Sequence, residues 1–387
     1  MLKLINDVAV AGIGQTEFSK NSGRSELQLT AESVKNALDD AGLKPADVDG
    51  LITYTLDNNE EVDLVRTMGM KDINYFSRMP FGGAGAVGTI AQGFGAIRAG
   101  MAEVVVVWRA MNERSEYRFG QASSMQGKRP GGGGTSDRSW AFDMGALTPM
   151  SWQALNAKVY MEKYGVTNED FGRVVVQQRE YAATNPDAYF YQRPITLEDH
   201  QNSRWIIEPV LRKFDCCQES DGGVAIVLTS LERARDLKQP LVKLYAAHGG
   251  GNGSQIATNH YTEDLSIMSE AIVTAKNLYA MADMTPSDIQ VAEIYEAYSC
   301  AVHYQLEAFG FCGLGEAKDF VNDGHLAING NLPTNTHGGL IGEAYIHGLN
   351  SFAEGVRQVR KTAVNQVQNV ENAIVTSGWS AAILSSV

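Results

Sequence analysis

The chain begins with an apolar segment followed by a helical pattern, which predicts a mixed α/β protein. Residues 7–14 (DVAVAGIG) are almost continuously apolar and end on glycine, as is typical of a buried strand that leads into a turn. Across residues 25–41 the apolar side chains recur at helical spacing, and Gly42 follows where such a helix would end. Residues 44–54 then predict a proline turn and a second strand.

The same succession returns in the second part of the chain. Residues 35–54 (KNALDDAGLKPADVDGLITY) align without a gap with residues 276–295 (KNLYAMADMTPSDIQVAEIY). Lysine, asparagine, alanine, proline, aspartate and tyrosine recur in register. A repeat that preserves both residue types and periodicity indicates two structurally similar units.

A second repeated pattern is a glycine pair followed by a helical segment and an apolar strand. Its first copy comprises Gly82, Gly83 and residues 84–99 and 103–108, and its second comprises Gly338, Gly339 and residues 349–361 and 372–378. We therefore predict an α/β fold of two similar halves, each with helices covering a largely apolar mixed sheet.

The predicted halves are residues 1–234 and residues 235–387, and the first carries an insertion at about residues 114–202. The insertion contains a glycine-rich run, residues 127–134. This run lacks the Gly-Lys-Ser/Thr ending and the preceding strand of a phosphate loop, so a loop without that role is the better interpretation. An insertion of this length is expected to cap a functional site.

Composition narrows the possible partners and compartments. The formal net charge of −13 argues against nucleic acid, although a ligand such as coenzyme A needs only one or two local cations. The polar first residues do not resemble a signal peptide, and the apolar strand at residues 104–108 is far shorter than a membrane span. We expect a cytoplasmic protein without a membrane span. The four cysteines lack metal-ligand spacing, which predicts free thiols and no metal site.

The segment with the highest density of candidate chemistry is residues 335–348 (NTHGGLIGEAYIHG). Its glycine pair is predicted to open the helix at residues 349–361, with Glu343, Tyr345 and His347 near the start of that helix. Backbone N–H groups at a helix start can hold an anion or an oxyanion. Taken alone, the segment is better explained as a glycine turn into an ordinary amphipathic helix, and only the rest of the chain favours a functional site.

Several motifs in this order carry a resemblance to a known family. They are AGLKPADVDG at residues 41–50, AIRAG at residues 96–100, SDGG at residues 220–223, and the segment at residues 335–348. The chain resembles the thiolase superfamily from end to end, and within it the sterol-carrier-protein-type thiolases and lipid-transfer proteins. The resemblance implies a thiolase fold, with its two pseudo-symmetric halves in a five-layered αβαβα arrangement and a loop-domain insertion.

The departures from that family concern its reactive groups. Gly82 stands where such thiolases carry the nucleophilic cysteine, Tyr295-Glu-Ala-Tyr298 replaces His-Asp-Cys-Phe, and Ala344-Tyr-Ile346 replaces Gly-His-Pro. The C-terminal cysteine loop has become VTSGW at residues 375–379. Acyl transfer needs a thiolate or similar nucleophile, so these changes argue against thiolysis. A thiolase that uses a displaced cysteine, with Cys300 the least implausible, stays open as an alternative.

Both positions of the lost histidines hold tyrosine, and a phenol can donate or accept a proton. Two such groups without a nucleophile suit retro-aldol cleavage through a thioester enolate. The pattern resembles the thiolase-like steroid side-chain aldolases of sterol- and bile-acid-degrading bacteria. That resemblance implies cleavage of a 17-hydroxysteroid 20-carboxyl-CoA to a 17-ketosteroid and propionyl-CoA. It also implies a homodimer, a small OB-fold partner in a heterotetramer, and no cofactor beyond the coenzyme A of the substrate.

The candidate catalytic residues are Tyr295 and Tyr345, and the sequence does not decide which of them takes the substrate proton. We favour Tyr295 as base and Tyr345 as proton donor to the enolate, because the resemblance places Tyr345 where the thiolase histidine serves the thioester oxygen; the reverse assignment stays open. Their hydroxyls are expected to face one cavity, and the pH profile is expected to rise on the alkaline side with an apparent pKa below that of free tyrosine. A noncatalytic scaffold or acyl-CoA-binding subunit, in which the two rings merely fill space, is the main alternative.

The expected substrate-binding residues surround this pair. They are Gly82, Gly83, Glu296, His337, Gly338, Gly339, Glu343 and His347. Gly82 and the pair Gly338–Gly339 are expected to line the floor of the cavity and to leave room where a cysteine side chain would lie. Candidates for the coenzyme A phosphates are Arg114, Arg118, Lys128 and Arg129, although a solvated basic loop is the better explanation of these residues.

Overall fold

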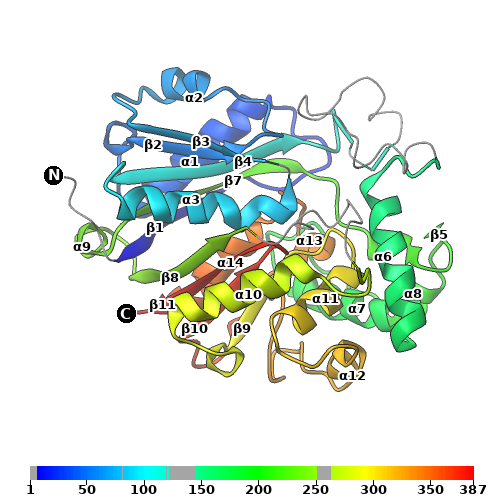
Figure 1. Cartoon of the computed structure of the whole chain (residues 1–387). Helices are drawn as coiled ribbons and strands as arrows, with labels where there is room; N and C mark the ends of the chain where they lie inside the picture. Colours follow the sequence, from blue (N-terminus) through cyan, green and yellow to red (C-terminus); the bar gives the residue numbers. More distant parts are fainter. Residues whose placement is uncertain (1–6, 81, 119, 122–143, 251–262) are drawn as a thin grey trace.

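The computed structural model describes residues 7–80, 82–118, 120–121, 144–250 and 263–387 (Figure 1). Within these residues nine strands form one mixed sheet. In spatial order the strands are β3 (Tyr75–Met79), β2 (Gly50–Tyr54), β4 (Val104–Asn112), β7 (Asp221–Ser230), β1 (Val8–Gln15), β8 (Val242–Gly249), β11 (Ser380–Ser386), β10 (Asn372–Thr376) and β9 (Val291–Ile294).

The sheet has the same pairing pattern in both halves. In the first half β2 is parallel to β4, β4 is antiparallel to β7, and β7 is antiparallel to β1. In the second half β9 is parallel to β10, β10 is antiparallel to β11, and β11 is antiparallel to β8. The halves join where Val8 and Ala9 of β1 pair with Leu244 and Lys243 of β8. The sequence repeat is therefore also a repeat of strand order and direction.

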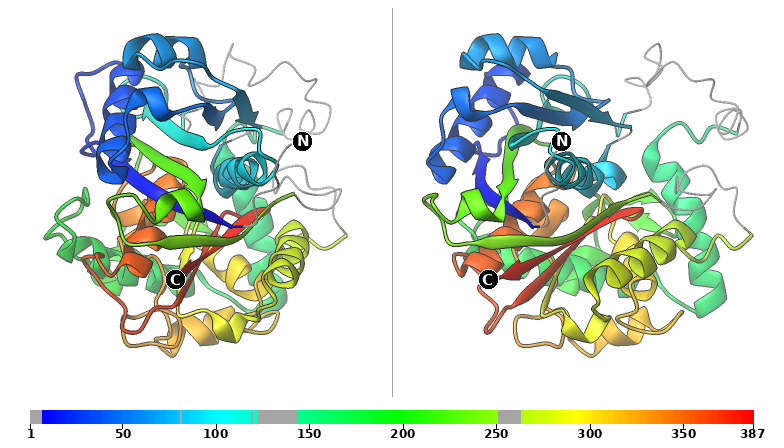
Figure 2. Two further views of the ribbon diagram at one scale, coloured as in Figure 1. Left: turned by 90° about the vertical axis from the view of Figure 1, so that its left-hand side faces the viewer. Right: turned by 60° about the vertical axis from the view of Figure 1, so that its left-hand side comes forward.

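Helices lie between the two halves of the sheet and on both outer faces (Figures 1 and 2). The inner helices α3 (Ala86–Arg98) and α14 (Leu349–Arg360) contact strands of both halves. The outer helices are α1 (Glu26–Ala41) and α2 (Glu61–Met68) on the first half, and α10 (Ser269–Ala282), α11 (Cys300–Ala308) and α12 (Ala317–Asn322) on the second. This order of layers is the predicted αβαβα arrangement.

The repeated segment folds as the sequence predicts. Ser25 caps α1 with a capping box, and Gly42 ends the helix in the left-handed region at φ 76°. The two proline turns are 3₁₀ helices, Pro45–Asp47 and Pro286–Asp288, each closed by its aspartate, which accepts from a backbone N–H at 2.8 or 2.7 Å. The predicted domain boundary between residues 234 and 235 falls between β7 and β8, and it stays a prediction.

The insertion carries α6 (Pro149–Tyr164), α7 (Asn168–Thr184) and α8 (Leu197–Gln201). The hairpin of β5 (Trp205–Ile207) and β6 (Leu211–Arg212) follows the insertion, and α9 (Leu231–Ala234) follows β7. Helix α7 packs against α12 and against the short helix α13 (Gly339–Gly342). The insertion thus covers the segment singled out for its chemistry. The glycine-rich run at residues 127–134, including Lys128 and Arg129, lies outside the described residues.

One prediction about this segment is wrong. The glycine pair opens α13, a separate helix of 4 residues, and α14 begins only at Leu349. Between them His347 and Gly348 take left-handed backbone conformations, with φ 49° and 85°, which interrupt a continuous helix. Tyr345 therefore lies on a turn between two helices. Among the described helices, none has the length and apolar character that crossing a membrane requires.

Candidate active site

Two tyrosine hydroxyls meet in the second half of the chain. The Oη atoms of Tyr295 and Tyr345 are 2.9 Å apart, and their ring planes are inclined at 48°. Tyr295 is half-buried, and Tyr345 is 8% exposed. The structure therefore brings together the two residues that the sequence singled out, at a distance at which one hydroxyl donates to the other.

Hydrogen bonds of the main chain hold both tyrosines in place. Tyr295 follows β9, its N–H donates to the carbonyl of Thr376 at 2.8 Å, and its carbonyl accepts from Gln305 Nε2 at 2.7 Å. The N–H of Tyr345 donates to the carbonyl of Gln218 at 3.2 Å, in the segment that leads into β7. The pair therefore depends on elements from three separate parts of the chain.

Burial raises the pKa of both phenols well above the ordinary value for tyrosine. The nearby side chains of Cys217 and Glu113 shift both pKa values further in the same direction. This direction contradicts the expectation of an apparent pKa below that of free tyrosine. Both phenols stay protonated at neutral pH, so each can donate and accept a proton without a preformed phenolate.

The glycine turn before α3 makes room for this arrangement. A Cβ atom at Gly83 would lie 1.9 Å from Cζ of Tyr295, so Gly83 lets the ring approach the turn. A Cβ atom at Gly82 would lie 2.8 Å from Nε2 of His347. The space expected to be open at Gly82, where a cysteine side chain would lie, is instead occupied by the imidazole of His347.

His347 is held by a buried ion pair from the first half. Its Nδ1 accepts from Arg109 Nε at 2.9 Å, and Arg109 Nη1 contacts Asp57 Oδ2 at 2.9 Å. Burial and the Arg109 charge lower the pKa of His347 well below its usual value. Because Nδ1 accepts, the neutral ring carries its proton on Nε2, the ring atom nearest to the Gly82 turn.

Glu296 lies beneath the short helix α13 and is completely buried. Its Oε1 accepts from the N–H groups of Leu340 at 2.6 Å and Ile341 at 3.4 Å. Burial raises its pKa to about 8, so the carboxyl is largely protonated at neutral pH. The observed contacts give Glu296 a structural role as the cap of α13, and its predicted role in substrate binding stays a prediction.

His337 and Glu343 also lie inside the protein, each at most 2% exposed. His337 Nδ1 is 3.0 Å from Glu293 Oε2, and Glu343 accepts from Asn350 Nδ2 at 2.8 Å. Both side chains are thus engaged with other protein groups. The structure shows these contacts within the protein, and the predicted contacts of His337 and Glu343 with substrate stay predictions.

The second glycine pair packs against the insertion. A Cβ atom at Gly338 would lie 2.7 Å from Cβ of Ala182 on α7, and a Cβ atom at Gly339 would lie 2.1 Å from Glu296 Oε1. Both glycines also have positive φ angles, 111° and 65°. Close packing under α7 and backbone conformation account for these glycines, and their place in a substrate cavity stays a prediction.

Comparisons with known proteins agree with this geometry. Residues 251–386 match the family of thiolase C-terminal domain-like sequences. The steroid side-chain-cleaving aldolase of Thermomonospora curvata is 52% identical over 96% of this chain and 94% of its own. The 17-hydroxy-3-oxo-4-pregnene-20-carboxyl-CoA lyase of Mycobacterium tuberculosis is 50% identical over 97% of both chains.

A solved structure extends the similarity to three dimensions. The Ltp2-ChsH2(DUF35) aldolase superposes with a TM-score of 0.92 at 50% sequence identity, over 99% of this chain and 98% of the other. The chain belongs to the thiolase superfamily. The predicted family and the predicted thiolase fold are therefore confirmed.

For a member of the thiolase superfamily, the cysteines are unusual. Burial raises the pKa of all four thiols, to about 12 for Cys216 and Cys312 and well above the usual value for Cys217 and Cys300. A thiol in such surroundings is not the thiolate that acyl transfer requires. Cys300, the candidate from the sequence, is the first residue of α11, and its side chain packs in the core.

The cysteine that influences the tyrosine pair is Cys217, and sequence reasoning missed it together with Glu113 and Lys20. Burial lowers the pKa of Lys20 to about 8, and its Nζ donates to Gln218 Oε1 at 3.1 Å. No motif marks these residues, because packing between distant segments brings them near the pair. The only sequence signal is a charged residue, Glu113, directly after a buried strand.

Two of the four proposed phosphate-binding residues lie in the described part of the chain. Arg118 forms an ion pair with Glu219, its Nε lying 2.7 Å from Oε2, and Arg114 is exposed. Arg118 thus fastens the start of the insertion to the segment that leads into β7. The ion pair of Arg118 and the exposure of Arg114 do not distinguish a phosphate site from a solvated basic loop, so the assignment of these residues to phosphate binding stays a prediction.

Proposed function

We propose that this chain is an aldolase that cleaves a β-hydroxyacyl-CoA thioester by a retro-aldol reaction. The proposed substrate is a 17-hydroxysteroid 20-carboxyl-CoA, and the products are a 17-ketosteroid and propionyl-CoA. The observation that carries the proposal is the 2.9 Å contact between the Tyr295 and Tyr345 hydroxyls at the two positions where thiolases place histidine. The similarity to named steroid aldolases supports the substrate class.

The two phenols can move one proton across the substrate without ionising. The proton of the β-hydroxyl passes to the Tyr295 oxygen, the Tyr295 proton passes to Tyr345, and the Tyr345 proton passes to the α-carbon. The O–H electron pair forms the new C=O bond of the ketone. The pair of the Cα–Cβ bond develops as a thioester enolate and takes the Tyr345 proton in the same concerted step, so that neither a protonated phenol nor a free phenolate arises. Atoms and charges balance, because the reaction consumes neither water nor a cofactor.

This relay agrees with the electrostatics of the pair. Both pKa values are raised by burial, which disfavours a free phenolate but leaves a neutral phenol able to accept and donate in one concerted transfer. Tyr295 is the proposed base and Tyr345 the proposed donor, in the order assigned from the family positions. Coenzyme A takes part only as a portion of the substrate.

We extend the proposal to the assembly. The solved relative bears a name with two components, Ltp2 and ChsH2(DUF35), and we propose that this chain also works with a small OB-fold partner in a heterotetramer. The homodimer surface is proposed to be the edge strand β3. Phe76 of β3 is 53% exposed beside Val62, and an edge strand presents unpaired backbone groups to a second copy.

The test is to incubate the protein, with and without an OB-fold partner, with a 17-hydroxysteroid 20-carboxyl-CoA in D₂O. We expect propionyl-CoA with one deuterium at C2 and an equal amount of 17-ketosteroid. Steroid-CoA binding without cleavage in both arms would instead identify a noncatalytic subunit. Release of acetyl-CoA or a covalent acyl-enzyme would identify thiolase chemistry.

A further inference from the structure

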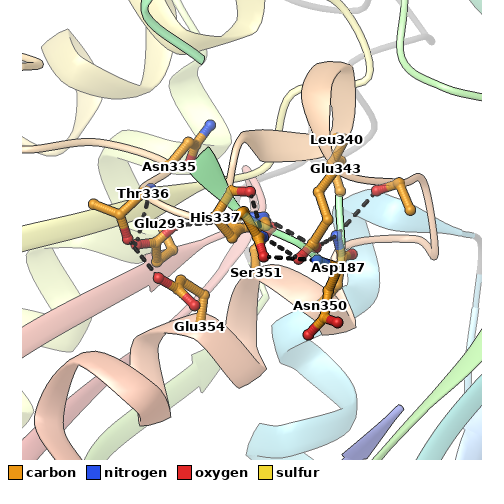
Figure 3. Close-up of polar contacts among 12 residues, drawn as sticks. Asp187, Glu293, Asn335, Thr336, His337, Leu340, Glu343, Asn350, Ser351 and Glu354 are labelled. Carbon is orange, nitrogen blue, oxygen red and sulfur yellow. Dashed lines mark hydrogen bonds and ion pairs between the residues drawn. The ribbon is translucent and has the colours of Figure 1, made fainter. Parts of the chain in front are cut away.

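Figure 3 shows a buried cluster of His337 with Glu293, Glu343 and Glu354, in the segments that carry the tyrosine pair. His337 Nδ1 is 3.0 Å from Glu293 Oε2, and His337 Nε2 is 3.9 Å from Glu343 Oε2. All three side chains are at most 1% exposed. A histidine whose two nitrogens face two separate carboxylates is well suited to carry a charge.

The two carboxylates have equivalent relations to the tyrosines. Glu293 precedes Tyr295 by two residues, and Glu343 precedes Tyr345 by two residues. His337 therefore bridges the two segments that carry the phenols. The bridge ties β9 to the turn between α13 and α14.

Uncharged contacts fasten the same segments. Asn335 Oδ1 accepts from the N–H of Ile294 at 2.6 Å, and Asn335 Nδ2 donates to the carbonyl of Ile294 at 2.9 Å, next to Tyr295. Asn185 Nδ2 donates both to the carbonyl of His337 at 2.9 Å and to Glu343 Oε1 at 3.2 Å. The histidine bridge thus lies within an ordered frame, and each carboxylate has further hydrogen bonds.

The charges around the imidazole are mostly negative. Thr336 Oγ1 lies between Glu293 and Glu354, with contacts of 2.9 and 2.8 Å, and Arg357 Nη1 is 3.3 Å from Glu354. The titratable and charged groups that influence His337 and its partners are Glu293 and Glu296 at β9, Glu343 after α13, Glu354 and Arg357 on α14, and Tyr181 on α7. A positive charge on His337 compensates several buried carboxylates.

We propose that His337 is a positioning residue whose charged imidazole, clamped between Glu293 and Glu343, sets the separation of the Tyr295 and Tyr345 hydroxyls. This inference rests on the proposed function for its effect on rate, because it assigns the buried cluster a role in that reaction. It replaces direct substrate contact by His337 with action through the protein frame. A shift of about 1 Å in a reacting group costs about 100-fold in rate, so a modest loosening of the frame is measurable.

The electrostatics give the proposal a distinctive pH dependence. Burial lowers the pKa of His337, but Glu343 and Glu293 outweigh burial and raise the pKa to about 9. Since the folded-state pKa lies above the ordinary value of 6.5, the stabilising charge is fully present below pH 6.5 and is lost as the pH rises through about 9. Activity should fall over the same alkaline range.

The decisive variant is His337→Gln, which can keep one hydrogen bond but cannot carry the charge. We expect kcat to fall about 100-fold with KM changed less than about 3-fold, and the alkaline fall near pH 9 to disappear. In a crystal structure of the variant, the two phenol oxygens should lie beyond hydrogen-bonding distance. The variant Glu343→Gln should lose rate similarly, and the double variant should lose little more than either single one.

The matched control is His303→Gln. His303 is equally buried on α11 but makes no ion pair among the described residues, and burial lowers its pKa to about 4. Its substitution should leave kcat and the alkaline fall of activity unchanged even if it lowers stability.

The proposal is overturned if His337→Gln keeps the wild-type kcat, the wild-type alkaline limb or the phenol separation of the wild type. If the wild type cleaves no steroid-CoA at all, the proposed function fails. In that case the phenol separation in the crystal structures still tests the positioning role.

Discussion

Tyr54 and Tyr295 stand at the same place in the two halves of the molecule and have different surroundings. Each closes the helix, proline turn and strand that the chain repeats. Tyr54 is fully buried, with its ring 5.8 Å from that of His347. Tyr295 is half-buried and hydrogen-bonded to Tyr345. Equivalent backbone positions have therefore produced one packing residue and one candidate catalytic residue.

The surroundings of the two tyrosines differ because different residues of the opposite half pack against each of them. His347 comes from the second half and fills the space beside Tyr54 and Gly82. Gly83 comes from the first half and leaves space beside Tyr295. The repeat of helix, proline turn and strand supplies the scaffold twice, whereas the residues that pack against its tyrosine from the other half decide which copy has chemistry. The comparison can be tested by substitutions at matched positions.

The largest effect is expected when the hydroxyls themselves are removed. Tyr295→Phe and Tyr345→Phe should each lower kcat about 1000-fold, because phenylalanine keeps the ring packing and removes only the transferable proton. Binding of the acyl-CoA, measured by calorimetry, should change little. Tyr54→Phe should keep kcat within about 3-fold, since no step is assigned to its hydroxyl. Full activity of the Tyr295/Tyr345 double variant would show that the tyrosine pair takes no part in the reaction.

The next largest effect is expected when a side chain is added in the space that Gly83 leaves for the Tyr295 ring. Gly83→Ala should lower kcat about 100-fold, because a Cβ atom there would lie 1.9 Å from the Tyr295 ring and must displace it. Gly95→Ala is the matched control within α3, where nothing lies within 4 Å of the added carbon. It should keep activity and stabilise the protein by about 0.5–1 kcal/mol in chemical unfolding. Equal kinetics for the two variants would contradict the close contact at Tyr295.

A smaller effect is expected on stability as a function of pH. Burial raises the pKa of Glu296 from 4.5 to about 8, so its contribution is fully present below pH 4.5 and is lost as the pH rises through about 8. The Tm of the wild type should fall between pH 7 and 9, with His337 adding to the fall. Glu296→Gln should reduce this slope, because the amide mimics the protonated carboxyl. His303→Gln should leave the slope unchanged, because burial lowers the pKa of His303 to about 4, outside this pH range. An unaltered slope in Glu296→Gln would refute the assignment of the Tm change to Glu296.

The smallest effect is expected for the cysteines. Replacing all four by serine should change kcat less than about 3-fold, because burial keeps every thiol protonated and the proposed relay uses none. Iodoacetamide should likewise leave the native wild type active. A loss of activity that follows Cys217→Ser alone would show that a thiol takes part beside the tyrosine pair.

Much of the fold could be predicted from the sequence because it depends on local patterns. The capping residue Ser25, the terminating Gly42 and the repeated proline turns are local signals, and the structure has all of them. The valine run beginning at Val104 has no polar interruption, and it is a buried central strand in the structure. The gap-free repeat then predicts that the two halves share one strand order.

The details of the site could be predicted less well because they depend on distant contacts. The family positions identified Tyr295 and Tyr345, but no local pattern shows that the His347 imidazole lies where Gly82 leaves space. The raised pKa values of the phenols likewise follow from burial among segments far apart in the chain. The helix predicted at residues 349–361 is present as α14, but the separate short helix α13 at the glycine pair was missed, because His347 takes a left-handed conformation that few side chains favour.

The narrow junction between β1 and β8 has a consequence for how the protein folds. Contacts between distant parts of the chain occur both at this junction, where Val8 pairs with Leu244, and inside the first half, where Val8 pairs with Ser230. The contact of Gly83 with Tyr295 also joins the two halves. Contacts of such long sequence separation form slowly, because a large loop must close before they contribute. The chemistry should therefore appear late in refolding, after the helices, whose hydrogen bonds are local, have formed.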